Sequence, residues 1–329
     1  KFYAYFKGET NKFTKLFIKD KLFVIGKINE KKCSFTDIDN ILKKICGLIR
    51  DDNKIINVQF LLIPIEEFIR HQVLRVVYYM YKFDKHKTKK NALKKSIHFC
   101  AVNKLKSVIL NSIKEAHIIN DMRDMVNEPG NIMNSTNFVK FVKENHQKLK
   151  LDVMDENQLK KKGLNLILAV NKGSLNKPYM LIVKWMPKKN QKPIALVGKG
   201  VTFDTGGINL KRYDFHDMKT DMTGASVVFS LLRLCALNKL KRNVIGLIPL
   251  VENMVGSKAT RPGDIITSYS KKTVEIMDTD AEGRLIMADA LSYAENFKPC
   301  CVIDVATLTG QAGSIFNQMS IVIMGNNDK

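Results

Sequence analysis

The chain has 329 residues, 45% of them hydrophobic and 26% charged, which is typical of a soluble globular protein and excludes disordered and fibrous classes. This length is enough for two domains that each bury a core. The longest apolar runs are far shorter than the ~20 residues of a membrane-spanning helix, so we expect no membrane partner. The net charge of +22 would suit a nucleic-acid partner, but the lysines are scattered, so this interpretation is not favoured.

Six cysteines lie along the chain without CxxC pairs or the regular spacing of a disulfide framework. A chain of this length does not need disulfides to stabilise its core, so we expect free thiols in a reducing compartment. The prediction is therefore a cytoplasmic protein. The sequence begins at Lys1 and not at a methionine, so any targeting peptide lies outside it. An organellar location therefore stays open.

The first third of the chain mixes strand-like and helical patterns. Short apolar runs at 21–28 and 96–102 indicate strands. In the segment FTDIDNILKKICGLI, 35–49, apolar residues recur at helical spacing and indicate a helix. We therefore predict a smaller N-terminal α/β domain over residues 1–105.

The rest of the chain first reads as a helix and then as an α/β pattern. The helical pattern covers 103–126 and ends at NEPGN, where proline and glycine stop it, so we assign 106–150 to a helical connector. Apolar runs then alternate with amphipathic helices, which predicts an α/β domain over 151–329 with a mostly parallel sheet buried on both faces. The strand-like runs are LNLILAVNKG, YMLIVKW, PIALVGKG, NVIGLIPLV, TVEIMD and CVIDVAT.

Acidic residues gather just after these runs, where open α/β sheets place their sites. The segments VGKGVTFDTGG, DMKTDMTGA and IMDTDAEGR supply Lys199, Asp204, Asp221, Asp280 and Glu282. Taken singly, each acid could be a helix cap or a solvated helix start. Four converging carboxylates need neutralising, so together they indicate a site for two divalent cations. Oxygen ligands suit Mg²⁺ or Mn²⁺, and zinc also accepts carboxylates, so the ligand type leaves the metal open.

Several ordered motifs, namely VGKGVTFDTGGINLK, MKTDMTGA, DTDAEGRL and VATLTG, resemble the leucyl (cytosol) aminopeptidase family of dinuclear metallo-exopeptidases. The segment at 122–133 is similar to the interdomain connector of that family, and 78–87 to part of its N-terminal domain. The resemblance implies a metal-dependent hydrolase that cleaves the N-terminal peptide bond of peptides and prefers leucine-like residues. It also implies a homo-hexamer, with 151–329 as the catalytic domain.

The resemblance assigns roles to individual residues. One Zn²⁺, Mn²⁺ or Mg²⁺ ion would be held by Lys199, Asp204, Asp221 and Glu282. The second ion would be held by Asp204, Asp280 and Glu282, so that a shared water becomes the nucleophile. Lys211 would be the catalytic lysine, and Arg284 would hold a bicarbonate that relays the proton. The substrate would contact Met218, Thr307, Leu308, Thr309 and Gly310.

The sequence departs from the family pattern in three places. Asp278 stands where asparagine is usual, and the loop 211–221 is slightly shorter and bulkier than usual. The sequence also stops at NNDK, where the catalytic domain of the family continues, so we expect that domain to be incomplete here. Together with the high positive charge, this keeps a second function open, a weakly active or inactive scaffold or nucleic-acid-binding component.

Overall fold

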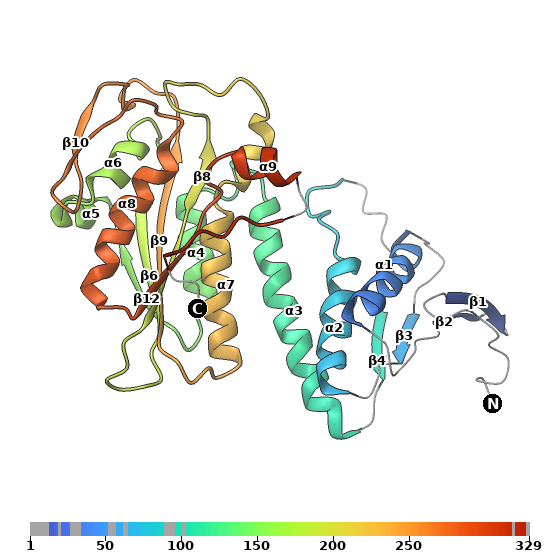
Figure 1. Ribbon diagram of the computed structural model, residues 1–329. Coiled ribbons are helices and arrows are strands. Elements are labelled where there is room, and N and C mark those ends of the chain that lie inside the picture. Colours follow the sequence, from blue (N-terminus) through green and yellow to red (C-terminus); the bar gives the residue numbers. More distant parts are fainter. Residues whose placement is uncertain are drawn as a thin grey trace. The chain divides into compact units, whose positions relative to one another are not determined.

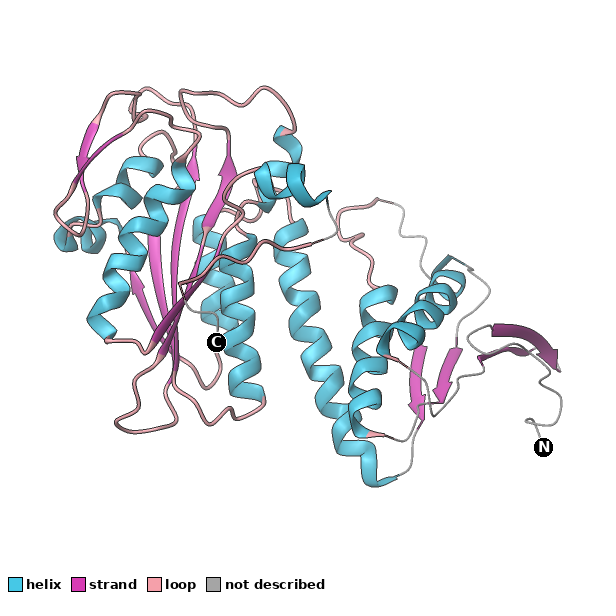
Figure 2. Cartoon of the chain, viewed as in Figure 1, coloured by secondary structure: helices cyan, strands magenta, loops and turns pink. Residues whose placement is uncertain are grey.

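The computed structural model describes residues 13–18, 21–26, 34–51, 57–61, 65–88, 96–100, 103–317 and 320–326. The chain divides into two compact units, Lys1–Asp121 and Met122–Lys329. Figure 1 shows the elements of both units, and Figure 2 separates helices from strands. The predicted domain limits at 105 and 150 stay a prediction.

The first unit is a small α/β structure, as the sequence predicted. Apolar residues of the predicted helix, Ile38 and Leu42 among them, pack against Val76 of the neighbouring helix. One strand pair is antiparallel and the other is parallel. The elements are β1 (Phe13–Ile18), β2 (Lys21–Gly26), α1 (Phe35–Asp51), β3 (Asn57–Leu61), α2 (Glu66–Met80), β4 (Ser96–Cys100), η2 (Asn103–Leu105) and α3 (Lys106–Asn127), which continues into the second unit.

A six-stranded sheet organises the second unit, in the order β12-β7-β9-β6-β5 with β8 also paired to β9. The pairings β12–β7, β7–β9 and β8–β9 are parallel, as predicted, whereas β6 pairs antiparallel with both β9 and β5. The strands are β5 (Lys150–Met154), β6 (Tyr179–Trp185), β7 (Ile194–Gly198), β8 (Gly200–Asp204), β9 (Val244–Asn253) and β12 (Cys301–Val305).

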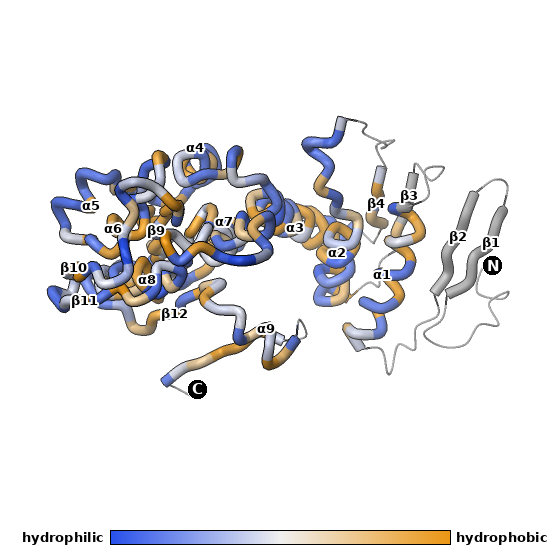
Figure 3. The backbone as a smooth tube through the Cα atoms, turned by 90° about the horizontal axis from the view of Figure 1, so that it is seen from above, coloured by the Kyte–Doolittle hydropathy of each residue, from blue (hydrophilic) through white to orange (hydrophobic). Residues whose placement is uncertain are grey.

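Helices cover both faces of this sheet, which makes three layers (Figure 1). The helices are α4 (Ser135–Asn145), α5 (Glu156–Lys162), α6 (Asn165–Asn171), α7 (Thr223–Leu237), α8 (Glu282–Ala294) and the short α9 (Gln311–Phe316), with 3₁₀ turns η3 (Phe215–Thr220) and η4 (Glu295–Phe297). Figure 3 shows that β9 is apolar while the peripheral α5 is hydrophilic.

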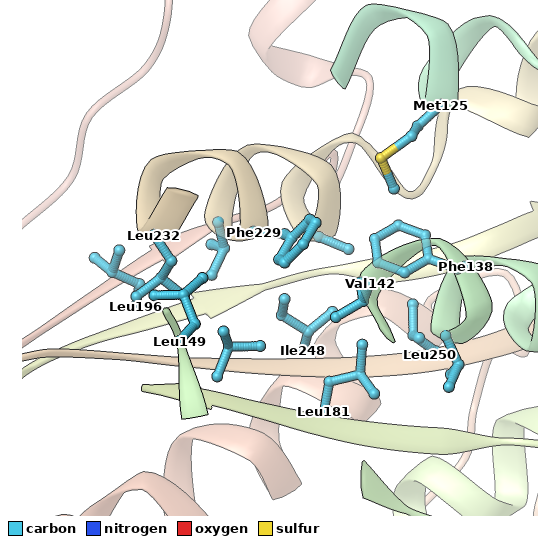
Figure 4. Close-up of a cluster of buried hydrophobic side chains, with 14 of the residues drawn as sticks. Met125, Phe138, Val142, Leu149, Leu181, Leu196, Phe229, Leu232, Ile248 and Leu250 are labelled. Carbon is cyan, nitrogen blue, oxygen red and sulfur yellow. The ribbon is translucent and has the colours of Figure 1, made fainter. Parts of the chain in front are cut away.

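Alternate residues of the strands supply two separate cores, because successive side chains of a strand point to opposite faces. On one face, Leu181 and Ile248 pack with Phe229 of α7 and with Phe138 of α4, the cluster drawn in Figure 4. On the other face, strand residues pack under α6 and α8. Burial on both faces explains why the strands read as continuous apolar runs.

Two of the runs that the sequence analysis grouped with strands do not join the sheet. LNLILAVNKG forms α6, so its strand prediction is wrong. The prediction failed because a short apolar run that is buried on most sides does not show the helical period of its residues. Within TVEIMD, Thr273–Glu275 forms β11, which pairs with β10 (Ile265–Thr267) in a separate antiparallel hairpin. The DTDAEGRL segment therefore follows a hairpin, and not a strand of the main sheet.

One helical stretch, Phe215–Leu237, is long and apolar enough by composition to span a membrane. Most of it is α7, whose apolar side chains pack on the sheet in the core of the second unit. We therefore assign α7 to the protein core. Among the described residues, Cys46, Cys100, Cys235, Cys300 and Cys301 are free thiols, as predicted. Cys33 lies outside the described residues.

The start of α7 approaches β12 so closely that only glycine fits there. A Cβ atom on Gly224 would lie 2.0 Å from the carbonyl oxygen of Val305. Because a backbone atom cannot give way as a flexible side chain can, we expect Gly224→Ala to lower the free energy of unfolding by about 1–3 kcal/mol. Urea denaturation measures this loss.

Gly47→Ala is the matched control, because a Cβ at this position of α1 meets nothing within 4 Å. This substitution is expected to stabilise the protein by about 0.5–1 kcal/mol, as alanine does in a helix interior. Equal stability changes for the two variants would contradict the close approach of α7 and β12.

Candidate metal centre

The five predicted metal ligands come from three segments that meet at one end of the sheet. Lys199 lies between β7 and β8, where its N–H donates to the carbonyl of Val305, and Asp204 ends β8. Asp221 follows η3 and precedes α7, and Glu282 is the first residue of α8. This position suits Glu282, because a carboxylate at a helix N-terminus is stabilised by the helix dipole.

Lys199 is the buried cation of the site, with 2% of its surface exposed. Its Nζ lies 2.8 Å from Asp221 Oδ1, 2.9 Å from Glu282 Oε1 and 2.8 Å from the carbonyl oxygen of Thr307. These contacts match the three donors of an ammonium group. Lys199 therefore connects the residues just before α7, the first residue of α8 and the segment that follows β12.

Lys211 faces the other two acids. Its Nζ lies 2.7 Å from Asp204 Oδ2 and 2.6 Å from Asp280 Oδ1. Asp204, Asp280 and Glu282 each present a ligand oxygen within 4.8 Å of the other two. The structure thus brings together all five predicted ligands and the predicted catalytic lysine.

The charges and hydrogen bonds of this cluster fit bound cations. Four carboxylates face two ammonium groups, so negative charge remains in excess. Among the described residues, the buried atoms Asp221 Oδ2 and Glu282 Oε2 have no hydrogen-bond partner. Burying charged oxygens without partners costs free energy, and a divalent cation can coordinate several such oxygens at once. Lys199 would join the ligands as a neutral amine.

Burial and repulsion between carboxylates raise the pKa values of Asp221 and Glu282. Burial, with Asp204 and Asp221 nearby, raises the pKa of Glu282 to about 7. Burial likewise raises the pKa of Asp221 to about 6, although Lys199 opposes the shift. For Lys211, burial favours the neutral amine, but Asp204 and Asp280 outweigh it and raise the ammonium pKa well above its usual value. Lys211 therefore stays charged at neutral pH.

These shifts predict a pH-dependent release of protons when metal binds. Without metal, Asp221 and Glu282 hold protons up to about pH 6 and pH 7, above the usual 3.8 and 4.5, so their contribution to folding stability falls as pH rises through this window. A metal ligand must be deprotonated, so Mn²⁺ binding is expected to release more protons at about pH 6 than at about pH 8. Calorimetric titration in buffers of different ionisation enthalpy measures this difference. Equal release at both pH values would contradict the raised pKa values.

The predicted substrate positions divide into those that contact the ligands and those that do not. The Thr307 hydroxyl donates to Asp221 Oδ1 over 2.7 Å, and Leu308 lies beside Gly283 with 47% of its surface exposed. Thr309 and Gly310 continue this exposed segment, whereas Met218 is half-buried in η3. Arg284 is exposed on the first turn of α8.

Asp278, which replaces the asparagine usual in the family, forms a local hydrogen bond. Its Oδ1 accepts the N–H of Asp280 over 2.9 Å and so stabilises the turn that carries this predicted ligand. His216 is exposed in η3. The sequence analysis missed Asn253, at the end of β9, whose side chain contacts Asp204. Only the pairing of β8 with β9 could have revealed it.

A buried cluster of carboxylates and lysines at the strand ends of a three-layer α/β unit defines a metal-binding α/β protein. Comparison with known families narrows this class. Residues 120–329 match the family model described as "Cytosol aminopeptidase family, catalytic domain", so the chain belongs to the cytosol aminopeptidase family.

Curated relatives carry the same description. A "Probable cytosol aminopeptidase" of Phytoplasma australiense is 40% identical over 250 residues, which cover 74% of this chain and 51% of the relative. One of Haemophilus influenzae (strain PittEE) is 43% identical over 251 residues, again 74% of this chain and 51% of the relative. The chain thus spans about half the length of the curated relatives it matches.

A solved structure confirms the fold. The bottromycin maturation enzyme BotP in complex with Mn has a TM-score of 0.83 and 25% sequence identity over 96% of this chain and 70% of that chain. The family membership and the mixed α/β fold that the sequence motifs predicted are therefore both confirmed.

Proposed function

We propose that this chain carries the metal centre of a metal-dependent aminopeptidase, which removes N-terminal residues from peptides and prefers leucine-like ones. The observation that carries the proposal is the convergence of Asp204, Asp280 and Glu282 within 4.8 Å, in a chain of this family. Lys199, Asp204, Asp221 and Glu282 would hold one divalent cation, Zn²⁺, Mn²⁺ or Mg²⁺. Asp204, Asp280 and Glu282 would hold a second one.

The chemistry that bound cations supply is Lewis acidity toward the scissile carbonyl and a water made nucleophilic at neutral pH. Lys211 stays charged, so its ammonium can stabilise the negative charge that develops on the carbonyl oxygen, an effect of roughly 3–4 kcal/mol in comparable sites. Arg284, exposed beside the site, would bind a bicarbonate that carries the proton to the leaving amine. Both roles are part of the proposal.

The segment after β12 is the proposed substrate-binding side of the centre. Thr307 is tied to Lys199 through its carbonyl and to Asp221 through its hydroxyl. This anchoring supports a role for Leu308, Thr309 and Gly310 in binding the peptide, with the exposed Leu308 side chain available for an apolar residue of the substrate. Met218 would contribute to the same substrate-binding side. We also propose a cytoplasmic homo-hexamer, after the family of the relatives.

Hydrolysis of leucine p-nitroanilide in the presence of Mn²⁺, Zn²⁺ or Co²⁺ tests the function. The N-acetylated substrate is the control, because the proposal requires a free α-amino group for binding, and it should not be cleaved. Asp280→Ala should abolish hydrolysis, whereas Asp152→Ala on the edge strand β5 should leave it unchanged. Metal-loaded protein that cleaves no N-terminal peptide substrate would favour the scaffold interpretation instead.

A further inference from the structure

We infer that Asn253 is a positioning residue of the metal centre, which fixes the Asp204 carboxylate relative to the segment that carries Asp280. The inference rests on the proposed function, because it concerns the same cations. Asn253 is the last residue of β9, with 4% of its surface exposed. The parallel pairing of β8 with β9 places it directly opposite Asp204.

The side-chain amide of Asn253 joins two ligand-bearing segments. Its Nδ2 donates to Asp204 Oδ1 over 2.8 Å and to the carbonyl oxygen of Thr279 over 3.0 Å. Both partners can only accept, so the orientation of the amide is fixed and both of its N–H groups are used. Thr279 directly precedes Asp280, so one buried amide connects the end of β8 with the turn before α8.

These contacts also decide which oxygen of Asp204 is available to a cation. Oδ1 accepts a second hydrogen bond, from the N–H of Gly206 over 2.9 Å. Two donors occupy the two lone pairs of Oδ1, so Oδ2, which also contacts Lys211 Nζ at 2.7 Å, is the oxygen that faces the proposed cations. Loss of the Asn253 amide would leave Oδ1 with the Gly206 N–H as its remaining donor of the two and would allow the carboxylate to rotate away from Asp280 and Glu282.

Tight packing around Asn253 supports a positioning role. Gly207 has a φ of 66°, and a Cβ there would lie 2.9 Å from Asn253 Oδ1 and 3.0 Å from Thr279 Oγ1. The Thr279 hydroxyl also donates to the carbonyl of Gly206 over 2.7 Å. The loop after Asp204 is therefore closed against the Asn253 and Thr279 side chains, which leaves the amide little room to adopt another rotamer.

Direct metal binding by Asn253→Ala tests the inference without reference to catalysis. Outer-shell partners of metal ligands typically contribute 10–100-fold to metal affinity, so the Kd for Mn²⁺ should rise about 10–100-fold. Electron paramagnetic resonance of free Mn²⁺ measures this Kd. The visible absorption bands of bound Co²⁺ should also shift, because they report the geometry of the ligands. Asn253→Leu, similar in shape but without donors, repeats the test should the alanine variant not fold.

Asn243 provides a matched control at the opposite end of β9. It is also a buried asparagine whose Nδ2 donates to two carbonyl oxygens, those of Lys188 and Gln191. Asn243→Ala should destabilise the fold but keep the wild-type Kd for Mn²⁺ within about twofold.

The outcomes separate the inference from the proposed function. Wild-type affinity in both Asn253 variants, or an equal loss of affinity in Asn243→Ala, would overturn the positioning role. Failure of the wild-type protein itself to bind Mn²⁺ would instead overturn the proposed metal centre.

Discussion

Lys199→Met is expected to lower the free energy of unfolding of the metal-free protein by about 3–5 kcal/mol, the usual cost of removing one partner of a buried ion pair. Lys199 is the buried cation between Asp221 and Glu282. Methionine retains the apolar stem but leaves these two carboxylates without their counter-charge. Urea denaturation in the presence of a chelator measures the loss.

The pH dependence of this loss identifies its cause. At about pH 5 both carboxyls can take up protons, so the destabilisation should be smaller there than at about pH 8. Lys184→Met is the control, because the Lys184–Asp152 pair, at 2.6 Å, joins β6 to the edge strand β5 and leaves 59% of the Asp152 side chain exposed. Removal of the Lys184–Asp152 pair should lower the free energy of unfolding by no more than about 1 kcal/mol. If Lys199→Met and Lys184→Met lowered the free energy of unfolding equally, burial of the Lys199 cluster would not be the cause of the loss.

Asp204→Ala is expected to weaken Mn²⁺ binding by more than about 100-fold, beyond the range of outer-shell effects. Asp204 is 2% exposed, forms an ion pair with Lys211 and is one of the three carboxylates that converge within 4.8 Å. In the proposed scheme it contacts both cations, so both sites should weaken together. Isothermal titration with Mn²⁺ measures the affinity and the number of ions bound.

The control for this variant is Asp152→Ala, which removes an exposed carboxylate from β5 and should leave Mn²⁺ binding unchanged. The metal-free Asp204→Ala protein should also remain folded, since removing one of four clustered carboxylates relieves repulsion. Mn²⁺ affinity within about tenfold of wild type would refute the assignment of Asp204 as a ligand that bridges the two cations.

The sequence predicted much of the fold and most of the candidate site, because their signals are local. Strands such as β7 and β9 are buried on both faces, so nearly every residue in them is apolar. Asp204 and Glu282 stand at a strand end and a helix start, and the motifs around them are compact. These residues could be found without knowing how the strands pair.

Features that depend on long-range pairing were not predictable in the same way. The segment of α6 is apolar because it is buried against the sheet and α8, and burial conceals its helical period. The β10–β11 hairpin is defined by pairing between residues that carry no distinctive pattern. The role of Asn253 follows from its register opposite Asp204, which no spacing along the chain encodes.

The most direct test of the metal centre is the number of cations that the protein binds. Equilibrium dialysis against Mn²⁺, followed by elemental analysis, should give saturation at two ions per chain, because in the proposed scheme the converging carboxylates and Lys199 form two overlapping ligand sets. Asp280→Ala should remove one of the two ions, because Asp280 belongs to only one of these sets. Saturation of the wild-type protein at one ion, or at none, would contradict the dinuclear centre.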